Sequence, residues 1–253
     1  MGAGPGRCRP LRDGRPHRGR GSGRVLAVHR LLAVHRTPLG APQRAGAGRV
    51  IHLVRHGETA YNRDGLGLGR ADQPLTGLGV EQARAVAARL ASLPVRRVLT
   101  SPLTRAAFVA ELVGEAHDLP VERSEALTEL DVGETEGLTF AAMRDRYPDF
   151  LRDWAGPDGW RAKMPGGESL ADLGLRLAPL IEELRADHEG DIVVVSHNFT
   201  LRALLCLMLG LPVSQFRSFE LGLASLTTLT VRNGRVSVRC VNDVCHLASL
   251  NLA

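Results

Sequence analysis

Short apolar runs of strand length alternate with stretches in which apolar residues recur every three or four positions. The first pattern is typical of buried β-strands and the second of amphipathic helices. The predicted strands are Val50–Val54, Val95–Thr100, Val121–Arg123, Ile192–Val195 and a hairpin, Leu226–Val231 with Val236–Val241, around Asn233-Gly234. Strands and helices that alternate in this way predict an α/β fold, a three-layer sandwich with a mainly parallel central sheet.

Capping residues indicate where several helices begin. Thr76 begins one helix, and Thr139 begins another that ends near Tyr147. Ser169 and Asp172 together resemble a capping box at the start of a third. These positions place helices between the predicted strands, as an α/β sandwich requires.

Proline positions refine two of the helices. Ser101-Pro102 predicts an N-cap followed by proline at the first helical position, for a helix that runs to about Glu115. Pro179 lies inside the helix that follows the capping box and predicts a kink or a shorter helix. The last predicted helix is Asn198–Leu209.

Residues 1–48 differ from the rest of the 253-residue chain in composition and charge. They are rich in glycine, proline and arginine, lack periodicity, and hold ten arginines against a single acid, Asp13. This segment carries a charge of +9 and residues 49–253 carry −4, for a total of +5. We predict a disordered basic extension over 1–48 and one folded domain over 49–253. We do not expect the folded domain to bind nucleic acid; any such binding would use the basic extension.

The four cysteines, Cys8, Cys206, Cys240 and Cys245, form no Cys-x-x-Cys pair, so they predict neither a zinc site nor a disulfide framework. We expect reduced thiols in a cytoplasmic protein. The apolar run Leu201–Leu211 is too short to span a bilayer, and we therefore expect no membrane segment. No pattern in the sequence indicates an oligomeric state.

Two predicted strands end in histidines. Arg55-His56 follows the first strand and His197 follows the nearly all-β-branched run Ile192–Val195. Arg105 lies in the first turn of the helix after another strand. Because ligands of open α/β sheets bind beyond the carboxyl ends of the strands, we expect these side chains to converge. Guanidinium groups match phosphate oxygens, and the set therefore indicates a site for a phosphoryl group.

Four motifs occur in order along the chain. They are Arg-His-Gly-Glu-Thr at 55–59, Ser-Pro-Leu-x-Arg-Ala at 101–106, Leu-x-Glu at 127–129 before Gly-x-x-Glu-Gly at 133–137, and a late Ser-His at 196–197. Together they resemble the histidine phosphatase superfamily, the phosphoglycerate-mutase-like group, and within it the phosphatase branch. The resemblance covers about residues 49–247 and implies the phosphoglycerate-mutase-like fold, with 49–253 as the catalytic domain.

The resemblance also implies a role for each residue that matches a motif. His56 is the implied nucleophile, which becomes phosphohistidine. Glu129 is the implied acid that protonates the leaving oxygen and later activates water. The residues implied to bind the phosphoryl group are Arg55, Arg105 and Asn62, joined by the second catalytic histidine, His197.

The expected activity is metal-independent hydrolysis of a phosphomonoester, with no cofactor, on a small phosphorylated metabolite. A phosphoglycerate mutase is the main alternative, and a sugar bisphosphatase or an α-ribazole-phosphate-type phosphatase fits the same residues. Mutases of the family share a Glu-Arg-x-Tyr-Gly run after the acid, whereas Glu129 precedes Leu-Asp-Val-Gly at 130–133. A non-catalytic phosphate-binding protein is disfavoured, because the five residues of the expected site are all intact.

Some positions depart from the family pattern or have a structural interpretation. Asn198 stands where the family usually has glycine, and Thr135 where many phosphatases have tryptophan. Glu168 is expected to act as a cap or as the partner of an arginine, and Arg202 to face solvent or an acidic partner. The lining that selects the substrate is expected from residues 140–165, namely Phe140, Met143, Tyr147, Trp154 and Trp160.

Overall fold

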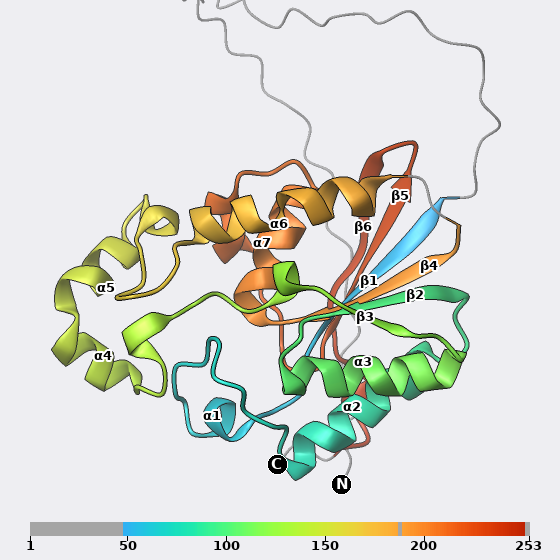
Figure 1. Ribbon diagram of the computed structural model, residues 1–253, viewed down its shortest axis with the longest axis horizontal. Helices are drawn as coiled ribbons and strands as arrows, with labels where there is room; N and C mark the ends of the chain where they lie inside the picture. Colours follow the sequence, from blue (N-terminus) through green and yellow to red (C-terminus); the bar gives the residue numbers. More distant parts are fainter. Residues whose placement is uncertain (1–47, 187–188, 251–253) are drawn as a thin grey trace, which may run out of the picture. The chain divides into compact units, whose positions relative to one another are not determined.

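The computed structural model describes residues 48–186 and 189–250. Apart from Gly48, the predicted extension over 1–48 lies outside the described residues. The strands are β1 Arg49–Arg55, β2 Val95–Thr100, β3 Val121–Arg123, β4 Asp191–Ser196, β5 Leu226–Arg232 and β6 Arg235–Asp243 (Figure 1). The helices are α1 Ala60–Arg63, α2 Gly77–Leu90, α3 Thr104–His117, α4 Phe140–Arg146, α5 Pro148–Ala155, α6 Leu170–Arg185 and α7 Asn198–Met208.

The six strands form one sheet in the order β3-β2-β4-β1-β5-β6. β1, β2, β3 and β4 pair in parallel, and β5 pairs antiparallel with both β1 and β6. The prediction of a mainly parallel sheet is therefore confirmed. The β5–β6 turn has positive φ at Asn233 (51°) and Gly234 (69°), as the predicted Asn-Gly hairpin turn requires.

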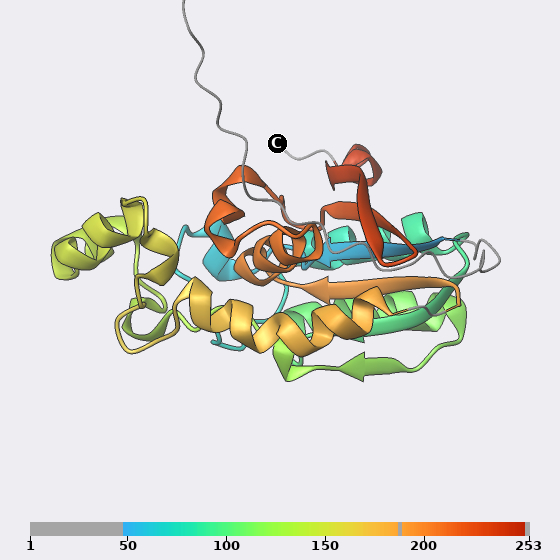
Figure 2. The same ribbon diagram turned by 90° about the horizontal axis from the view of Figure 1, so that it is seen from above.

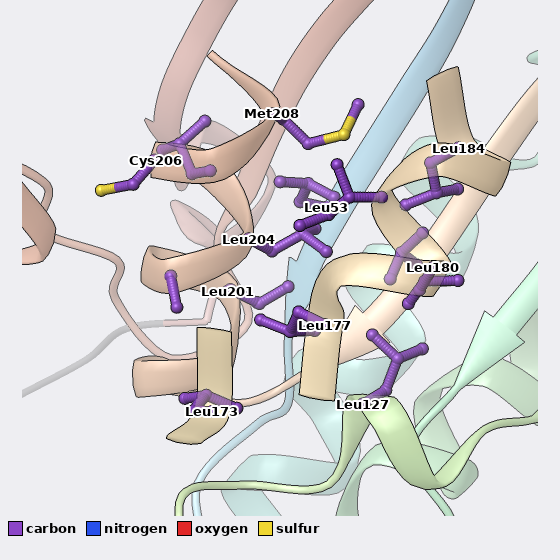
Figure 3. Packing of buried hydrophobic residues seen from close by; sticks show 14 of the residues in the cluster. Leu53, Leu127, Leu173, Leu177, Leu180, Leu184, Leu201, Leu204, Cys206 and Met208 are labelled. Atoms are coloured by element: carbon purple, nitrogen blue, oxygen red, sulfur yellow. The ribbon is translucent and has the colours of Figure 1, made fainter. Parts of the chain in front are cut away.

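Successive side chains of the central strands point to opposite faces of the sheet and form two hydrophobic cores. The first core lies under α6 and α7, and the second lies under α2 and α3. Ile192 and Val194 pack with leucines of α6 and α7, whereas Val193 and Val195 pack with α2 and α3. Figure 2 shows helices on both sides of the sheet. Figure 3 shows the first core at close range, where leucines of α6 and α7 meet Leu53 of β1. This arrangement is the three-layer sandwich that the alternation predicted.

The predicted caps of α2, α4 and α6 are confirmed, and the predicted start of α3 is wrong. Thr76, Thr139 and Ser169 each accept a hydrogen bond from the third helical residue. α3 begins at Thr104 instead of Pro102. The reason is a long-range cap: Asp72 accepts from the Thr104 main-chain N at 2.7 Å.

Pro179 does not end α6, which runs on to Arg185. Pro179 lies on the exposed side of the helix, where water can hydrogen-bond to the carbonyl left without a donor. Across the two described ranges, no helix is both long and apolar enough to cross a membrane.

Packing under α6 predicts that replacing two leucines of that helix changes the stability of the protein by different amounts. Leu177 is fully buried in the first core and Leu175 is 76% exposed. We expect Leu177→Ala to lower the free energy of unfolding by about 2–5 kcal/mol, since it leaves a cavity. The control Leu175→Ala should change it by less than about 0.5 kcal/mol. Urea unfolding measures both, and equal losses would contradict this packing.

Candidate active site

The ends of β1 and β4 place two histidines side by side. The strands are parallel neighbours with Arg55 opposite Ser196, and each runs directly into the histidine that follows it. The imidazole rings of His56 and His197 have centroids 5.1 Å apart at an interplanar angle of 58°. His56 is 3% exposed and His197 is fully buried. The structure thus brings together the two histidines that the sequence placed at strand ends.

Hydrogen bonds hold His56 in one orientation and one tautomer. Its main-chain N donates to the Ser196 carbonyl at 3.1 Å, and its carbonyl accepts from the Ala224 N at 2.9 Å. The ring Nδ1 lies 2.7 Å from the Gly57 carbonyl oxygen. Because a carbonyl can only accept, Nδ1 carries the hydrogen, and the lone pair of the neutral ring lies on Nε2. Nε2 is therefore the atom that can act as a nucleophile.

Burial and positive charge keep both imidazoles neutral. Burial lowers the pKa of His56 well below its usual 6.5, and the charges on Arg105 and Arg55 lower it further. Burial is also the largest cause of the lowered pKa of His197, and the positive charges on Arg105 and Arg55 lower it further. Neutral imidazole is the form in which a histidine can attack.

Main-chain carbonyls hold the two arginines beside the histidines. Arg55 donates from Nη1 to the Leu221 carbonyl at 2.7 Å. Arg105 is fully buried and donates from Nη1 and Nη2 to the carbonyls of Ala71 and Gly69, at 2.8 and 2.6 Å. Burial lowers the pKa of Arg55 to about 10, so its guanidinium remains charged at neutral pH.

Four buried nitrogen atoms of these side chains have no hydrogen-bond partner among the described residues. They are Nε of Arg55, Nε of Arg105 and both ring nitrogens of His197. Leaving a buried polar atom unpaired costs about 1–3 kcal/mol, and such atoms are rare in native proteins. An anion with several acceptor oxygens, such as a phosphoryl group, matches the two arginine N–H groups and the one N–H of the neutral His197 ring. No group of three or more histidine, cysteine or acidic side chains suited to a metal ion occurs within 48–186 and 189–250.

Glu129 is 3% exposed and lies at the N-terminus of α7. Its Oε1 accepts from the main-chain N atoms of Leu130 (2.8 Å) and Thr200 (3.1 Å). Its Oε2 accepts from the Phe199 N at 3.1 Å. The N-terminus of α7 supplies the N–H groups of Phe199 and Thr200 and also the positive end of the helix dipole. A carboxylate is stabilised at such a position. Among the described residues, Oε2 accepts a single hydrogen bond and so keeps a lone pair for proton transfer.

Arg176 of α6 holds the segment that carries Glu129, a role that the sequence did not reveal. Its guanidinium donates to the carbonyls of Glu125, Ala126, Thr128 and Glu129 at 2.9 to 3.3 Å. Glu168 accepts from Arg176 Nε and Nη2 at 3.2 and 3.1 Å, which agrees with its expected role as an arginine partner. Helical periodicity marks Arg176 only as a polar position, because its partners are main-chain atoms distant in sequence.

Asn62 has a structural hydrogen bond in addition to its implied role. Its side-chain Oδ1 accepts from the main-chain N of Thr59 at 3.2 Å, completing the capping box of α1. Only the amide Nδ2 of Asn62 can therefore donate to a phosphoryl oxygen.

The predicted lining residues differ in how far they are exposed. Trp154 packs edge-on against Phe199, the α7 residue bonded to Glu129, with ring centroids 5.8 Å apart. Phe140, by contrast, is 65% exposed. Arg202, expected to face solvent or an acidic partner, is half-buried and donates from Nε to the Phe216 carbonyl at 2.8 Å. Its charge contributes, after burial, to the lowered pKa of Arg55.

Comparisons with known proteins identify relatives over most of the chain. A family profile described as "Histidine phosphatase superfamily (branch 1)" matches residues 51–244. The chain is 33% identical to "Phosphoserine phosphatase 1" of Hydrogenobacter thermophilus over 77% of this chain and 92% of that one. It is 33% identical to "Probable phosphoglycerate mutase GpmB" of Proteus mirabilis, over 80% and 96%. The crystal structure of a putative alpha-ribazole-5'-P phosphatase from Escherichia coli superposes with a TM-score of 0.72 at 29% identity, covering 78% and 97%.

The neutral buried histidines predict how stability depends on pH. The unfolded chain protonates its histidines near pH 6.5, while the lowered pKa values keep His56 and His197 neutral in the folded chain. Their contribution is thus fully present above pH 6.5 and is lost as the pH falls, by about 1.4 kcal/mol per pH unit for each residue.

We expect His197→Gln to remove one of the two contributions. Urea unfolding at pH 7.5 and pH 5.5 should show a smaller loss of stability on acidification for the variant than for the native chain. An identical loss in both proteins would show that His197 is not held neutral.

Proposed function

Because the chain belongs to the histidine phosphatase superfamily, we propose that it hydrolyses phosphomonoesters of small metabolites through a phosphohistidine formed on His56. The observation that carries this proposal is the set of buried, unpaired nitrogens on Arg55, Arg105 and His197 beside a neutral imidazole. This arrangement presents a nucleophile and an oxyanion site to one phosphorus atom.

In the first step His56 Nε2 attacks phosphorus. A P–N bond forms and the ester P–O bond breaks. Arg55, Arg105 and His197 hold the non-bridging oxygens, where negative charge is spread in the transition state. The anionic substrate brings a proton into the site, which Glu129 holds at Oε2 and gives to the leaving oxygen, and the alcohol departs neutral.

In the second step water attacks the phosphohistidine. Glu129, now a carboxylate, takes a proton from the water as its oxygen bonds to phosphorus. The P–N bond breaks, inorganic phosphate leaves, and His56 returns to its neutral form. The Nδ1–H bond to Gly57 holds the ring in place through both steps. Fixed positive charge comes from two guanidinium groups, so the scheme uses no metal ion and no cofactor.

The substrate class is supported by the names of similar proteins. One relative is called a phosphoserine phosphatase and one structural neighbour an alpha-ribazole-5'-P phosphatase. Phosphoglycerate isomerisation is a second candidate activity, supported by the similarity to the Proteus mirabilis protein. Hydrolysis is favoured because residues 130–133 lack the Glu-Arg-x-Tyr-Gly run of the mutases.

We further propose that residues 49–253 act as the catalytic domain without the basic segment 1–48, since the family profile falls within 51–244. Free thiols at Cys206, Cys240 and Cys245 fit a cytoplasmic enzyme.

The nucleophile is tested with p-nitrophenyl phosphate. We expect hydrolysis that persists in EDTA and that falls by at least about a thousand-fold in His56→Ala. His117→Ala, at the far end of α3 from Arg105, is the matched control and should leave kcat/KM unchanged. Turnover that requires an added metal, or that survives loss of His56, would contradict the scheme. Phosphoglycerate isomerisation dependent on 2,3-bisphosphoglycerate and faster than hydrolysis would assign the mutase activity.

The acid is tested by varying the leaving group. Glu129→Gln keeps the size of the side chain but cannot supply a proton, and we expect kcat/KM for an alkyl phosphate to fall about 10²–10⁴-fold. The loss should be much smaller for p-nitrophenyl phosphate, whose leaving group departs without protonation. Equal losses for both esters would assign Glu129 a role other than general acid.

A further inference from the structure

The loop that carries the contacts of Arg105 has no regular secondary structure of its own. Residues 67–73 lie between α1 and α2, outside any helix or strand. Two carbonyls of this loop, those of Gly69 and Ala71, accept the hydrogen bonds that orient the buried guanidinium. The orientation of the Arg105 guanidinium therefore depends on the position of this loop.

The carboxylate of Glu136 bonds to the same two loop residues from the other side. Its Oε1 accepts from the Gly69 main-chain N at 2.7 Å, and its Oε2 accepts from the Ala71 N at 3.0 Å. Gly69 and Ala71 thus donate to Glu136 and accept from Arg105. The negative charge of Glu136 also raises the pKa of Arg105, against the larger effect of burial.

Neighbouring contacts fix the two ends of the loop. Gly67 exchanges main-chain hydrogen bonds of 2.8 Å with Gly137 and Leu138, the residues that follow Glu136. Asp72 caps α3 through the Thr104 N at 2.7 Å. In the middle of the loop, Glu136 accepts from the main-chain N–H groups of Gly69 and Ala71, and the Arg70 side chain pairs with Asp131 and Glu168.

Building on the proposed phosphatase activity, we propose that Glu136 is a positioning residue for Arg105. It acts through the Gly69 and Ala71 main chain and does not touch the phosphoryl group. Its removal releases the two carbonyls that aim the Arg105 guanidinium. Since small displacements of a positioned group cost most in the transition state, we expect kcat to fall more than KM rises.

The test is a double-mutant cycle on kcat/KM for p-nitrophenyl phosphate. Glu136→Gln leaves one acceptor oxygen for two N–H groups, and we expect a loss of about 10–100-fold, the range found when residues that orient catalytic ligands are changed. In an Arg105→Met background the same substitution should have no further effect, because the group that it positions is absent. Glu122→Gln is the matched control, since Glu122 also forms two hydrogen bonds, to Arg97 on β2, and it should leave activity unchanged.

A merely structural role for Glu136 predicts a different result. In that case Glu136→Gln would lower kcat/KM by the same factor in both backgrounds, and this outcome overturns the inference. Thermal melting of each variant establishes that the fold is retained. If Glu136→Gln does not fold, Glu136→Asp replaces it in the cycle, since it keeps the carboxylate but shortens its reach.

Vanadate inhibition provides an independent readout. Vanadate resembles the phosphoryl transition state, whereas inorganic phosphate resembles the product. We expect Glu136→Gln to weaken inhibition by vanadate more than inhibition by phosphate, and equal weakening would contradict positioning of Arg105. The native chain separates failure of this inference from failure of the proposed function. If the proposed function is wrong, the native chain itself shows no hydrolysis that depends on His56.

Discussion

The site depends on two guanidinium groups that are held at the edge of the core beside two imidazoles. Removing a charge from water is unfavourable unless hydrogen bonds and opposite charges compensate. Arg55 and Arg105 obtain this compensation from three main-chain carbonyls and from the nearby carboxylate of Glu129. Burial lowers the pKa of both imidazoles, His56 and His197, and this positive charge lowers it further. In the mechanism that we propose, the same charges therefore bind the anionic substrate and help to keep the nucleophile neutral.

The fold produces this arrangement because the ends of several strands and helices meet at one place. β1 and β4 deliver the histidines because they are parallel neighbours. The N-terminus of α7 holds Glu129 through two main-chain N–H groups, which keeps an acid close to the arginines. Further hydrogen bonds to main-chain atoms support these groups. Arg176 donates to the carbonyls of residues that precede Glu129, and Arg105 donates to the carbonyls of Gly69 and Ala71. Hydrogen bonds between side chains and main-chain atoms thus position the charged groups of the site.

The parts that could be predicted from sequence are those encoded by local patterns. Apolar periodicity predicted the strands, and strand ends predicted that His56 and His197 would meet. The Asn233-Gly234 turn was also predictable, because its conformation depends on those two residues alone. The roles of Glu129 and Asn62 came from resemblance to a family, since no periodicity distinguishes them from nearby polar residues.

The remaining features depend on partners distant in the chain. Ser101-Pro102 has the local pattern of a helix start, yet Asp72 caps α3 at Thr104 across about thirty residues of sequence. Arg202 has the pattern of a surface residue, yet its stem packs near Phe216 with the guanidinium 5.3 Å from the ring centroid. Such contacts are decided by tertiary packing, which overrides local preference.

The claim that His56 is a neutral nucleophile in a cationic pocket is tested most directly by trapping its product. The native chain is mixed with a radiolabelled phosphomonoester, quenched in alkali within the first turnover, and mapped by peptide. The account predicts label on the peptide that contains His56, stable in base and lost in acid, as expected for a phosphoramidate. Label on any other residue, or turnover of the ester without label at His56, would contradict it.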